Sequence, residues 1–501
     1  MKGELLTLRQ LLDRIAIYDS RVCMVEKKKD LIIKHTVNDF RSDVYALGTA
    51  LLDLGLKGKN ISILGENSYE WVVAHAATLF SGAVAIPVDM NLTPQEISER
   101  MKFTGAVALV HSSLYEEKAR EAGKMTPGLV VAGFGTVKTE RFLDKLRGAF
   151  GLGDSIWRQD HLELDEDSTG EPQTSMIVFT SGTTSKPRGA ELTIQSMETF
   201  CEWAGMCLPM REGQRSLMLL PLHHIFGVCV VYLMLSHGVA LGVCPDFRRI
   251  YDAFERFRVN FAFLVPALAE ILAQKIQQRG DSAEEALGQP LEWILTGGAA
   301  LPRRTYEHLT ALGVKMITGY GLTETAAAYS ITPCAGDPHV GAQGKASLAK
   351  GVETKVSPDG ELLIKGPCVM KGYYRLPEKT AAVIDGDGWY HTGDLGRIDD
   401  DGFVWITGRA SRTIILSSGK KIAPEELEEK LLSLPGIREA IVSGEGETRE
   451  IKAEIYASIP EASVIRVVGE LNARLPVYKR VRTIVVRNEP FPRTSSGKIR
   501  L

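Results

Sequence analysis

The first 110 residues alternate between strand and helix patterns, and this alternation constrains the fold more than any other feature of the chain. Residues 61–65 and 84–88 are short apolar, β-branched runs, which is the pattern of buried strands. Between them, residues 68–82 repeat apolar side chains such as Trp71 and Leu79 at helical spacing. Strands joined by helices in this way run parallel in one sheet. The sequence therefore predicts an α/β fold whose mostly parallel sheets are covered by helices.

The next helix has its own start signals. Thr93-Pro94-Gln95-Glu96 combines a capping box with a proline in the first helical turn. An irregular acidic segment at 163–171 interrupts the alternation, and we interpret it as a surface loop. The alternation resumes after this loop, so the segment on either side of it belongs to one large N-terminal domain.

Beyond Gly408 the pattern changes to that of a small α+β unit. A unit of roughly 90 residues is large enough to fold independently. We therefore expect an N-terminal domain at 1–408, a C-terminal lid domain at 409–501 and a hinge at about 408–412. The elements predicted in the lid are strands at 413–416, 439–442, 451–457 and 483–486, and helices at 424–434 and 463–475.

Composition excludes several classes of protein. A chain of 501 residues with a net charge of −3 is a poor match for a nucleic-acid-binding protein, and we interpret Lys27–Lys29 as a solvated turn. The seven cysteines are scattered and form no Cys-x-x-Cys pair, as expected for reduced thiols in a cytosol. The first residues lack the pattern of a signal peptide. We therefore expect a cytoplasmic protein.

Residues 226–244 carry no Asp, Glu, Lys or Arg and are long enough to span a bilayer. However, Ser236-His237-Gly238 interrupts the run at a point where a helix would end. Residues 239–244 then have the pattern of a buried strand. We predict a core helix followed by a core strand, and no transmembrane span.

A strand at 177–179 leads into a loop that is crowded with hydroxyl groups, glycines and two cations. Backbone N–H groups and short donors in such a loop can bind a polyphosphate, and Lys186 and Arg188 can offset its charge. Pro187-Arg188 stands where the common phosphate loop of kinases and GTPases needs Gly-Lys. On residue types alone, an ordinary surface turn remains open. The candidate phosphate-binding residues are Thr180, Ser181, Gly182, Thr183, Thr184, Lys186, Arg188 and Gly189.

This loop resembles the signature of the adenylate-forming superfamily, which includes acyl-CoA synthetases, non-ribosomal peptide adenylation domains and luciferases. The resemblance covers almost the whole chain, from the segment at 67–71 to the last residues. The segments 296–299 and 419–424 look most like those of AMP-forming long-chain fatty acyl-CoA synthetases. Four further motifs follow in the family's order: Gly319–Thr325, Tyr390–Gly396, Gly408-Arg409 leading to 419–424, and Pro492–Lys498.

The resemblance implies that a carboxylate attacks the α-phosphate of ATP to form an acyl-adenylate. Residues 180–189 would hold the β- and γ-phosphates, and Tyr320 would stack on adenine. Thr323 would contact the α-phosphate, and Glu324 would hold Mg²⁺, which keeps most of its waters. Asp394 would accept hydrogen bonds from the ribose hydroxyls with help from Arg409.

Lys498 would bridge the acid and the α-phosphate, with Ser495-Ser496-Gly497 giving the flexibility for this reach. In a second step the resemblance implies transfer of the acyl group to the thiol of coenzyme A, after rotation of the lid. Gly419 would line the thiol tunnel, and Lys420 and Lys421 are candidates for the nucleotide end of coenzyme A.

Five positions depart from the family's pattern. Ser185 replaces glycine and Arg188 replaces lysine in the loop, and Arg188 keeps the charge with a different geometry. At the hinge the chain has Ser411, Arg412 and Ile415. We expect the hinge changes to affect the second half-reaction more than adenylation.

The acid is expected to bind among apolar and small residues. His224 occupies the place of the family's gating residue, next to Phe226. A metal at His223-His224 is disfavoured because no further ligands have suitable spacing. The aspartate that amino-acid-activating relatives place here is missing, so a medium or long fatty acid is favoured, with aryl acids next. The candidate pocket residues are Phe226, Gly297, Gly298 and Ala299.

Two alternatives stay open at this point. An acyl carrier protein could replace coenzyme A as the acceptor, because both present a phosphopantetheine thiol. The chain could also be a catalytically silent nucleotide- or acyl-binding relative, given the departures in the loop and hinge. Thr323, Glu324, Asp394, Arg409 and Lys498 are all present, which argues against a silent relative.

Overall fold

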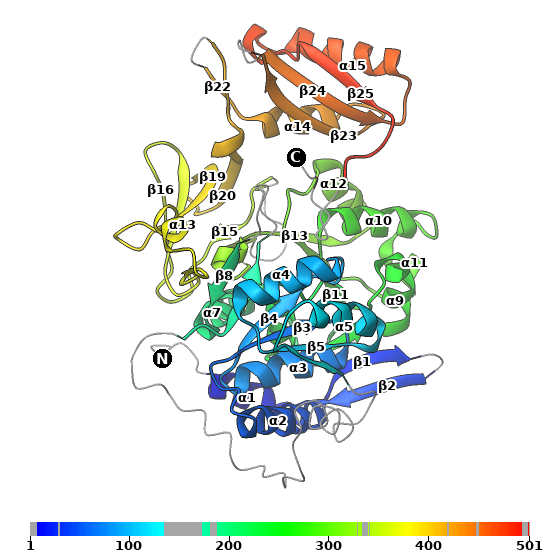
Figure 1. Cartoon of the computed structure of the whole chain (residues 1–501). Helices are drawn as coiled ribbons and strands as arrows, with labels where there is room; N and C mark the ends of the chain where they lie inside the picture. The colour runs from blue at the N-terminus through cyan, green and yellow to red at the C-terminus, as the bar shows by residue number, and fades with distance from the viewer. Residues whose placement is uncertain are drawn as a thin grey trace.

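The computed structural model shows a large N-terminal part and a smaller C-terminal unit, which lies above it in Figure 1. It describes residues 8–28, 31–134, 173–180, 188–327, 329–332, 339, 341–417, 420–446, 450–492 and 499. The predicted surface loop at 163–171 lies outside these ranges.

A seven-stranded sheet forms the centre of the N-terminal part. Its five strands from β3 to β7 pair in parallel, while β7, β8 and β18 pair antiparallel. The parallel pairing predicted from the alternation at 61–88 is confirmed. In spatial order the strands are β18 (Gly372–Tyr373), β8 (Gly189–Leu192), β7 (Met176–Phe179), β4 (Val84–Val88), β3 (Asn60–Leu64), β5 (Ala108–His111) and β6 (Val130–Gly133).

Helices join these strands, as the sequence predicts. α4 begins after Thr93, whose hydroxyl accepts from the Glu96 N–H while the Glu96 carboxylate accepts from the Thr93 N–H. Ser68 caps the helix that follows β3. The helices of this region are α1 (Leu8–Ala16), α2 (Val37–Asp53), α3 (Tyr69–Phe80), α4 (Pro94–Thr104), η1 (Ser113–Tyr115) and α5 (Glu116–Lys124).

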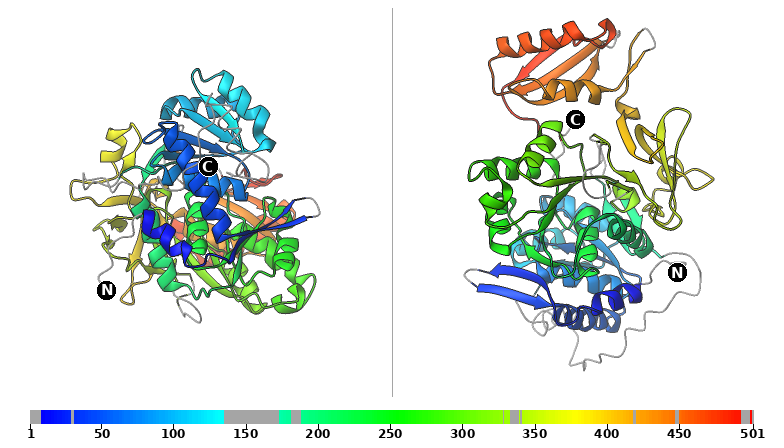
Figure 2. Two further views of the ribbon diagram at one scale, coloured as in Figure 1. Left: turned by 90° about the horizontal axis from the view of Figure 1, so that it is seen from below. Right: turned by 180° about the vertical axis from the view of Figure 1, so that it is seen from behind.

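A second group of strands continues the N-terminal part, as the view from behind in Figure 2 shows. Two sheets adjoin where the Asn260 side chain accepts from the Arg215 N–H at 2.8 Å. Their orders are β2 (Leu31–Thr36), β1 (Val22–Lys28), β10 (Ala240–Val243), β9 (Arg215–Met218), and β11 (Phe261–Leu264), β12 (Trp293–Thr296), β13 (Lys315–Tyr320), β14 (Ser330–Ile331), β15 (Lys345–Ala346). Their helices are α7 (Ile194–Cys207), α8 (Ile225–Leu235), η2 (Phe247–Arg249), α9 (Ile250–Phe257), α10 (Pro266–Gln277), α11 (Ala283–Leu287) and α12 (Arg303–Ala311).

The hairpin β1–β2 corrects the interpretation of the lysine run as a solvated turn. Lys27 and Lys28 belong to strand β1, and Lys28 forms ion pairs with Glu26 at 2.9 Å and Glu70 at 2.5 Å. The sequence pattern missed the Lys28–Glu70 pair because Glu70 is 42 residues away. Lys29 lies outside the described residues.

A fourth sheet of the N-terminal part is antiparallel throughout, which the sequence pattern did not predict. It carries the end of the N-terminal part, shown in yellow and orange in Figure 1, and reaches Arg409. Its strands are β16 (Glu353–Val356), β17 (Glu361–Lys365), β19 (Tyr390–Ile398) and β20 (Val404–Arg409), and α13 (Pro377–Ala381) precedes β19.

The C-terminal unit has its own core, in which Leu427 and Val464 are fully buried. The predicted lid elements are all present, although the strand predicted at 413–416 covers only two residues. The boundary within 408–412 stays a prediction. The elements are η4 (Ala410–Arg412), β21 (Ile414–Ile415), β22 (Lys421–Ile422), α14 (Pro424–Leu432), β23 (Ile437–Glu445), β24 (Glu450–Ala457), α15 (Glu461–Arg474), η5 (Val477–Lys479) and β25 (Thr483–Arg487).

The apolar run at 226–244 lies in the core, as predicted. Its helix α8 is buried almost completely and ends at Ser236, and the run continues into strand β10. In the described part of the chain, no helix has both the length and the apolar character to cross a membrane.

One buried carboxyl in this core makes stability depend on pH. Glu198 on α7 is 4% exposed, and its Oε1 has no hydrogen-bond partner among the described residues. Burial raises the pKa of Glu198 to about 8, which Glu202 reinforces and Arg14 opposes. The folded state therefore holds this proton more tightly than the unfolded chain, and stability falls as pH rises from about 4.5 to about 8.

We expect Glu198→Gln to stabilise the protein, because a neutral amide needs no proton. From the pKa difference, the gain in unfolding free energy is about 1 kcal/mol at pH 5 and about 3 kcal/mol at pH 7. Denaturant unfolding at both pH values measures it. Glu202→Gln, at a partly exposed position on the same helix, should show a much smaller gain. If Glu198→Gln raises the unfolding free energy by the same amount at both pH values, the prediction is contradicted.

Candidate active site

Strands β7 and β8 hold the two ends of the predicted phosphate loop side by side. Phe179 pairs with Gly189, and the Thr180 N–H donates to the Arg188 carbonyl at 2.8 Å. A Cβ at Gly189 would lie 2.6 Å from Ile177 Cγ2, so only glycine fits here without a shift. The loop residues between these ends lie outside the described part of the chain: Ser181, Gly182, Thr183, Thr184, Ser185, Lys186 and Pro187.

Glu324 lies in the short helix η3 (Thr323–Thr325), directly after strand β13. Its Oε1 accepts a hydrogen bond of 2.8 Å from the Tyr373 hydroxyl, and its carbonyl accepts from the Met370 N–H at 2.8 Å. Ala326 and Ala327 follow with φ angles of 49° and 82°, which is a strained turn for residues other than glycine. The turn and both hydrogen bonds set the direction of the Glu324 carboxylate.

A second carboxylate is held between two partners. Asp394 is 3% exposed; its Oδ2 accepts from the Tyr320 hydroxyl at 2.5 Å and its Oδ1 pairs with Arg409 Nε at 2.6 Å. Strands β19 and β20 place Asp394 opposite Arg409. Burial, reinforced by the Asp394 charge, raises the pKa of Tyr320 well above its usual range, so Tyr320 stays a donor. The sequence named all three residues, and the structure brings them into contact.

Tyr390 lies near Glu324 and near the two partners of Asp394. Burial raises the pKa of Tyr390, and the charge of Glu324 adds to this effect while Arg409 opposes it. Tyr320 and Arg409, which also affect the pKa of Tyr390, are the two partners of Asp394. Glu324 and Asp394, which are 70 residues apart in the sequence, form one polar region at the carboxyl end of strand β13.

The predicted acid-binding residues gather next to this region. Gly297 follows β12, the parallel neighbour of β13, and a Cβ there would lie 3.3 Å from the Phe226 ring and 3.5 Å from the Gly319 carbonyl. Phe226 packs edge-on against Phe263 with ring centroids 6.2 Å apart. Phe226 and Gly297 are therefore in contact, whereas Gly298 and Ala299 are exposed.

His224 is the residue before helix α8, and its ring lies 4.4 Å from that of His223. His223 is buried, pairs with Asp89 at 3.5 Å, and has a pKa lowered by burial. The described residues contain no group of three or more side chains suited to a metal ion.

Asn67 is a structural element of the site that sequence reasoning did not single out. Its amide donates to the Met218 carbonyl at 3.2 Å and the Leu220 carbonyl at 2.9 Å, and accepts from the Leu222 N–H at 3.2 Å. These bonds tie the start of α3 to the segment leading into His224. No local pattern signals them, because the partners are more than 150 residues away.

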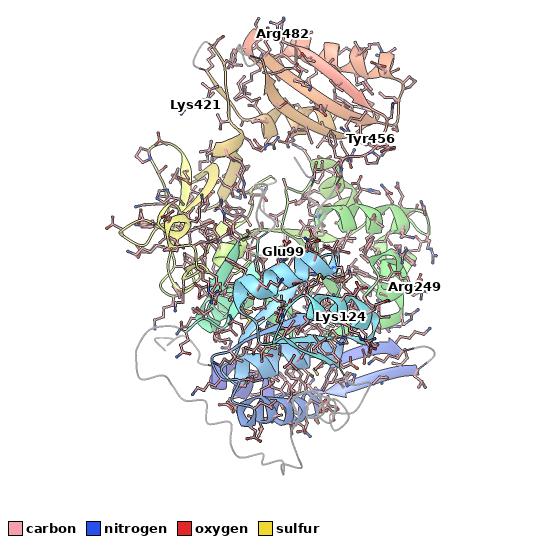
Figure 3. All side chains as sticks on the ribbon, in the orientation of Figure 1. Glu99, Lys124, Arg249, Lys421, Tyr456 and Arg482 are labelled. Atoms are coloured by element: carbon pink, nitrogen blue, oxygen red, sulfur yellow. The ribbon has the colours of Figure 1, made fainter. Side chains whose placement is uncertain are left out.

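The C-terminal unit holds the remaining predicted residues. The Lys420 ammonium lies 3.8 Å from the centre of the Tyr478 ring, and Lys421 lies on the neighbouring hairpin strand, at the edge of the unit in Figure 3. Lys420 is therefore placed apart from the Tyr320–Asp394 region, on the other unit. Gly419 and Lys498 lie outside the described residues.

Arg412, in the predicted hinge, has clear partners. Its guanidinium pairs with Glu425 at 2.9 Å and Glu428 at 2.6 Å, both on helix α14. It also donates to the Val442 carbonyl at 3.4 Å. Arg412 therefore belongs to the C-terminal unit, whereas Arg409, three residues earlier, binds Asp394.

Comparison with known proteins identifies the family. The family model described as AMP-binding enzyme matches residues 9–374, and the model of the AMP-binding enzyme C-terminal domain matches residues 411–500. The chain belongs to the AMP-binding enzyme family. The resemblance to the adenylate-forming superfamily and the predicted fold class are confirmed.

Relatives of this AMP-binding enzyme include CoA ligases for different acids. It is 30% identical to 4-coumarate–CoA ligase 2 of Oryza sativa subsp. japonica over 491 residues, which covers 90% of this chain and 83% of the relative. It is 27% identical to long-chain-fatty-acid–CoA ligase FadD15 of Mycobacterium bovis over 466 residues, covering 82% and 75%. The AMP-binding enzyme is therefore an AMP-forming acid–thiol ligase, and its relatives do not specify the acid.

A solved structure supports the fold. O-succinylbenzoate coenzyme A synthetase (MenE) from Bacillus subtilis, in complex with ATP and magnesium ion, superposes with a TM-score of 0.79 at 24% identity. The match covers 98% of each chain. It includes both the N-terminal part and the C-terminal unit of the AMP-binding enzyme.

Proposed function

We propose that this AMP-binding enzyme activates a medium- or long-chain fatty acid with ATP and transfers the acyl group to coenzyme A. The observation that carries the proposal is the Tyr320–Asp394–Arg409 group beside the apolar contact of Phe226 with Gly297. The Tyr320–Asp394–Arg409 group is suited to binding a nucleotide, and the Phe226–Gly297 contact is suited to an uncharged acyl chain. The relatives named above are CoA ligases, which supports coenzyme A as the acceptor.

The polar region would bind the nucleotide. The buried Asp394 carboxylate would accept hydrogen bonds from the ribose hydroxyls, oriented by Tyr320 and Arg409. The Tyr320 ring would lie against adenine. Thr323 and the loop at 180–189 would contact the phosphates, and Lys498 would approach the α-phosphate.

Glu324 fits a magnesium ion. Its carboxylate supplies the hard oxygen ligand that Mg²⁺ prefers, and it is partly exposed, so phosphate oxygens and water could complete the shell. When bound, Mg²⁺ would neutralise charge on the phosphates of ATP. Tyr373 would keep the Glu324 side chain in place during this contact.

In the first half-reaction a carboxylate oxygen of the acid attacks the α-phosphorus, and the bond to pyrophosphate breaks. Such a reaction depends on positioning and charge neutralisation more than on a base. Residues 180–189, Thr323 and Lys498 would supply both. In the second half-reaction the thiolate of coenzyme A attacks the acyl carbonyl and AMP leaves, with Gly419 and Lys420 on the path of the thiol.

The apolar side favours a fatty acid. Phe226 and Phe263 supply aromatic walls, and Gly297 leaves space that a side chain would fill. Residues 221–227 contain no aspartate that could pair with a substrate amine, which argues against an amino acid as the substrate. The relatives also include ligases for aryl acids, so aryl acids are the comparison group in the test.

The test is acid-dependent AMP release with Mg-ATP and coenzyme A. Saturated fatty acids of graded length and several aryl acids are supplied in turn, and Lys498→Ala serves as the background control. We expect the highest kcat/KM among medium or long fatty acids. A maximum among aryl acids would replace the proposed substrate, and release of no AMP with any acid would overturn the proposed reaction.

Gly297→Val tests where the acid binds. A Cβ at 297 already lies 3.3 Å from the Phe226 ring, so valine would fill the space beside it. We expect kcat/KM for the longest accepted acid to fall at least about 10-fold relative to the shortest, because pocket methylenes discriminate on this scale.

The matched control is Gly469→Val on α15, where a Cβ meets nothing within 4 Å. It should leave the acid profile unchanged. If Gly297→Val shows the wild-type order of acids at any overall rate, the acid does not bind along this contact.

A further inference from the structure

Tyr373 touches two parts of the site that the sequence treated as separate. Its hydroxyl donates to Glu324 Oε1 at 2.8 Å, and its ring lies 5.2 Å from the Arg188 guanidinium carbon. Arg188 belongs to the predicted phosphate loop, and Glu324 is the candidate magnesium ligand. Tyr373 therefore contacts both a residue of the predicted phosphate loop and the residue proposed for the metal.

The backbone fixes Tyr373 in this place. Strand β18 pairs with β8, so that Tyr373 lies opposite Ala190, two residues after Arg188. The next residue, Tyr374, donates its N–H to the Gly189 carbonyl at 2.8 Å. Tyr373 is 5% exposed, so its ring cannot move without disturbing the edge of the central sheet.

The hydroxyl can act only as a donor toward the carboxylate. An ionised carboxylate has no hydrogen to donate, so the phenol O–H donates to Glu324 Oε1 at 2.8 Å. Tyr373 engages Oε1 and leaves the other carboxylate oxygen of Glu324 available to a ligand.

The arginine at 188 suits this contact better than the lysine usual in the family. A guanidinium is planar, stacks on aromatic rings and donates in several directions, whereas an ammonium is a compact point charge. Arg188 can therefore contact the Tyr373 ring and still offer donors to a phosphate. Arg188, which departs from the family's pattern, therefore has a contact partner in Tyr373.

We propose that Tyr373 is a positioning residue that orients the Glu324 carboxylate toward the magnesium ion of Mg-ATP. The contact of Arg188 with the Tyr373 ring couples this orientation to the phosphate loop. The inference rests on the proposed function, in which Glu324 holds the metal. Outer partners of metal ligands typically contribute 10- to 100-fold in metal affinity, and the Tyr373 hydroxyl has the place of such a partner.

The alternative is that Tyr373 only fills the core beside β18, where it packs with other buried residues. Tyr373→Phe separates the two, because phenylalanine keeps the ring and its packing and removes only the hydroxyl. A thermal-unfolding measurement of the variant confirms that it is folded. A purely structural role predicts no change in magnesium dependence.

The experiment measures ATP binding by calorimetry with graded Mg²⁺ and with excess EDTA, and ATP–pyrophosphate exchange over the same Mg²⁺ range. In Tyr373→Phe we expect the half-saturating Mg²⁺ concentration to rise about 10-fold, with ATP affinity in EDTA unchanged. Arg188→Lys should raise the half-saturating Mg²⁺ concentration by a smaller factor and also weaken ATP binding in EDTA.

Tyr374→Phe is the matched control, because its hydroxyl donates to the Thr104 carbonyl at 3.0 Å, away from Glu324. It should retain the wild-type Mg²⁺ dependence. The inference is overturned if Tyr373→Phe keeps the wild-type Mg²⁺ dependence, or if ATP affinity falls equally with Mg²⁺ and EDTA. Mg²⁺-dependent ATP binding without turnover of any fatty acid would reject the proposed substrate and leave the role of Tyr373 intact.

Discussion

Glu324→Gln is expected to lower the rate of adenylation about 100- to 1000-fold, the range seen when one preorganised electrostatic contact to a transition state is lost. Glutamine has nearly the same size, and its carbonyl oxygen can still accept from the Tyr373 hydroxyl. The change therefore removes the negative charge and little else. A neutral amide is a weaker ligand for Mg²⁺ than a carboxylate. ATP–pyrophosphate exchange with the preferred acid measures the effect.

Glu353→Gln is the control, because it makes the same chemical change at an exposed position on strand β16. It should keep the wild-type rate. Higher Mg²⁺ should recover part of the Glu324→Gln rate if the loss is one of metal binding. If Glu324→Gln retains more than about a third of the wild-type rate at limiting Mg²⁺, well above the loss expected for such a contact, Glu324 does not hold the metal.

Asp394→Asn is expected to weaken ATP binding about 100-fold. Both carboxylate oxygens face donors, Tyr320 on one side and Arg409 on the other, and the group is almost fully buried. Asparagine turns an NH₂ group toward one of these donors, so a buried donor is left unpaired and Arg409 loses its counter-charge. A hydrogen bond to a charged acceptor contributes roughly 1.5–3 kcal/mol, and the upper end of this range corresponds to about 100-fold in affinity. Calorimetry with ATP measures the loss of affinity.

The role of Asp394 is tested with 2′-deoxy-ATP and 3′-deoxy-ATP. The wild-type protein should bind each deoxynucleotide about 10-fold more weakly than ATP, because each lacks one hydrogen bond to a charged acceptor. The Asp394→Asn variant should discriminate much less. A wild-type protein that binds all three nucleotides equally would show that Asp394 does not contact the ribose.

Local patterns predicted most of the regular elements, because capping and apolar spacing act over a few residues. The start of α4 at Thr93 and the break at Ser236 are examples. The antiparallel sheet from β16 to β20 was missed, since its strands carry no helix–strand alternation. The Lys28–Glu70 pair was missed for a related reason: sequence spacing does not encode contacts between distant segments.

The candidate site also contains residues that the sequence predicted and residues that only the structure revealed. Resemblance singled out Tyr320, Asp394 and Arg409, and the structure places them in contact, while their roles in catalysis stay proposals. Tyr373 escaped notice because its partner Glu324 is 49 residues away and no short motif joins them. From the sequence, Arg412 was only a departure from the family's pattern. Its ion pairs became visible in the fold, which brings helix α14 beside the predicted hinge.

Arg409, which precedes η4, and Arg412, its last residue, together limit how the C-terminal unit can move. Arg409 is anchored to Asp394, and Arg412 is anchored to Glu425 and Glu428. The chain between these anchors contains only Ala410 and Ser411. Any rotation of the C-terminal unit relative to β20 must therefore come from the backbone torsions of this two-residue connection, or it must break the ion pairs of Arg409 or Arg412. If the nucleotide contacts Asp394 as proposed, it acts on the same two-residue connection, so nucleotide binding to one unit would be coupled to the orientation of the other.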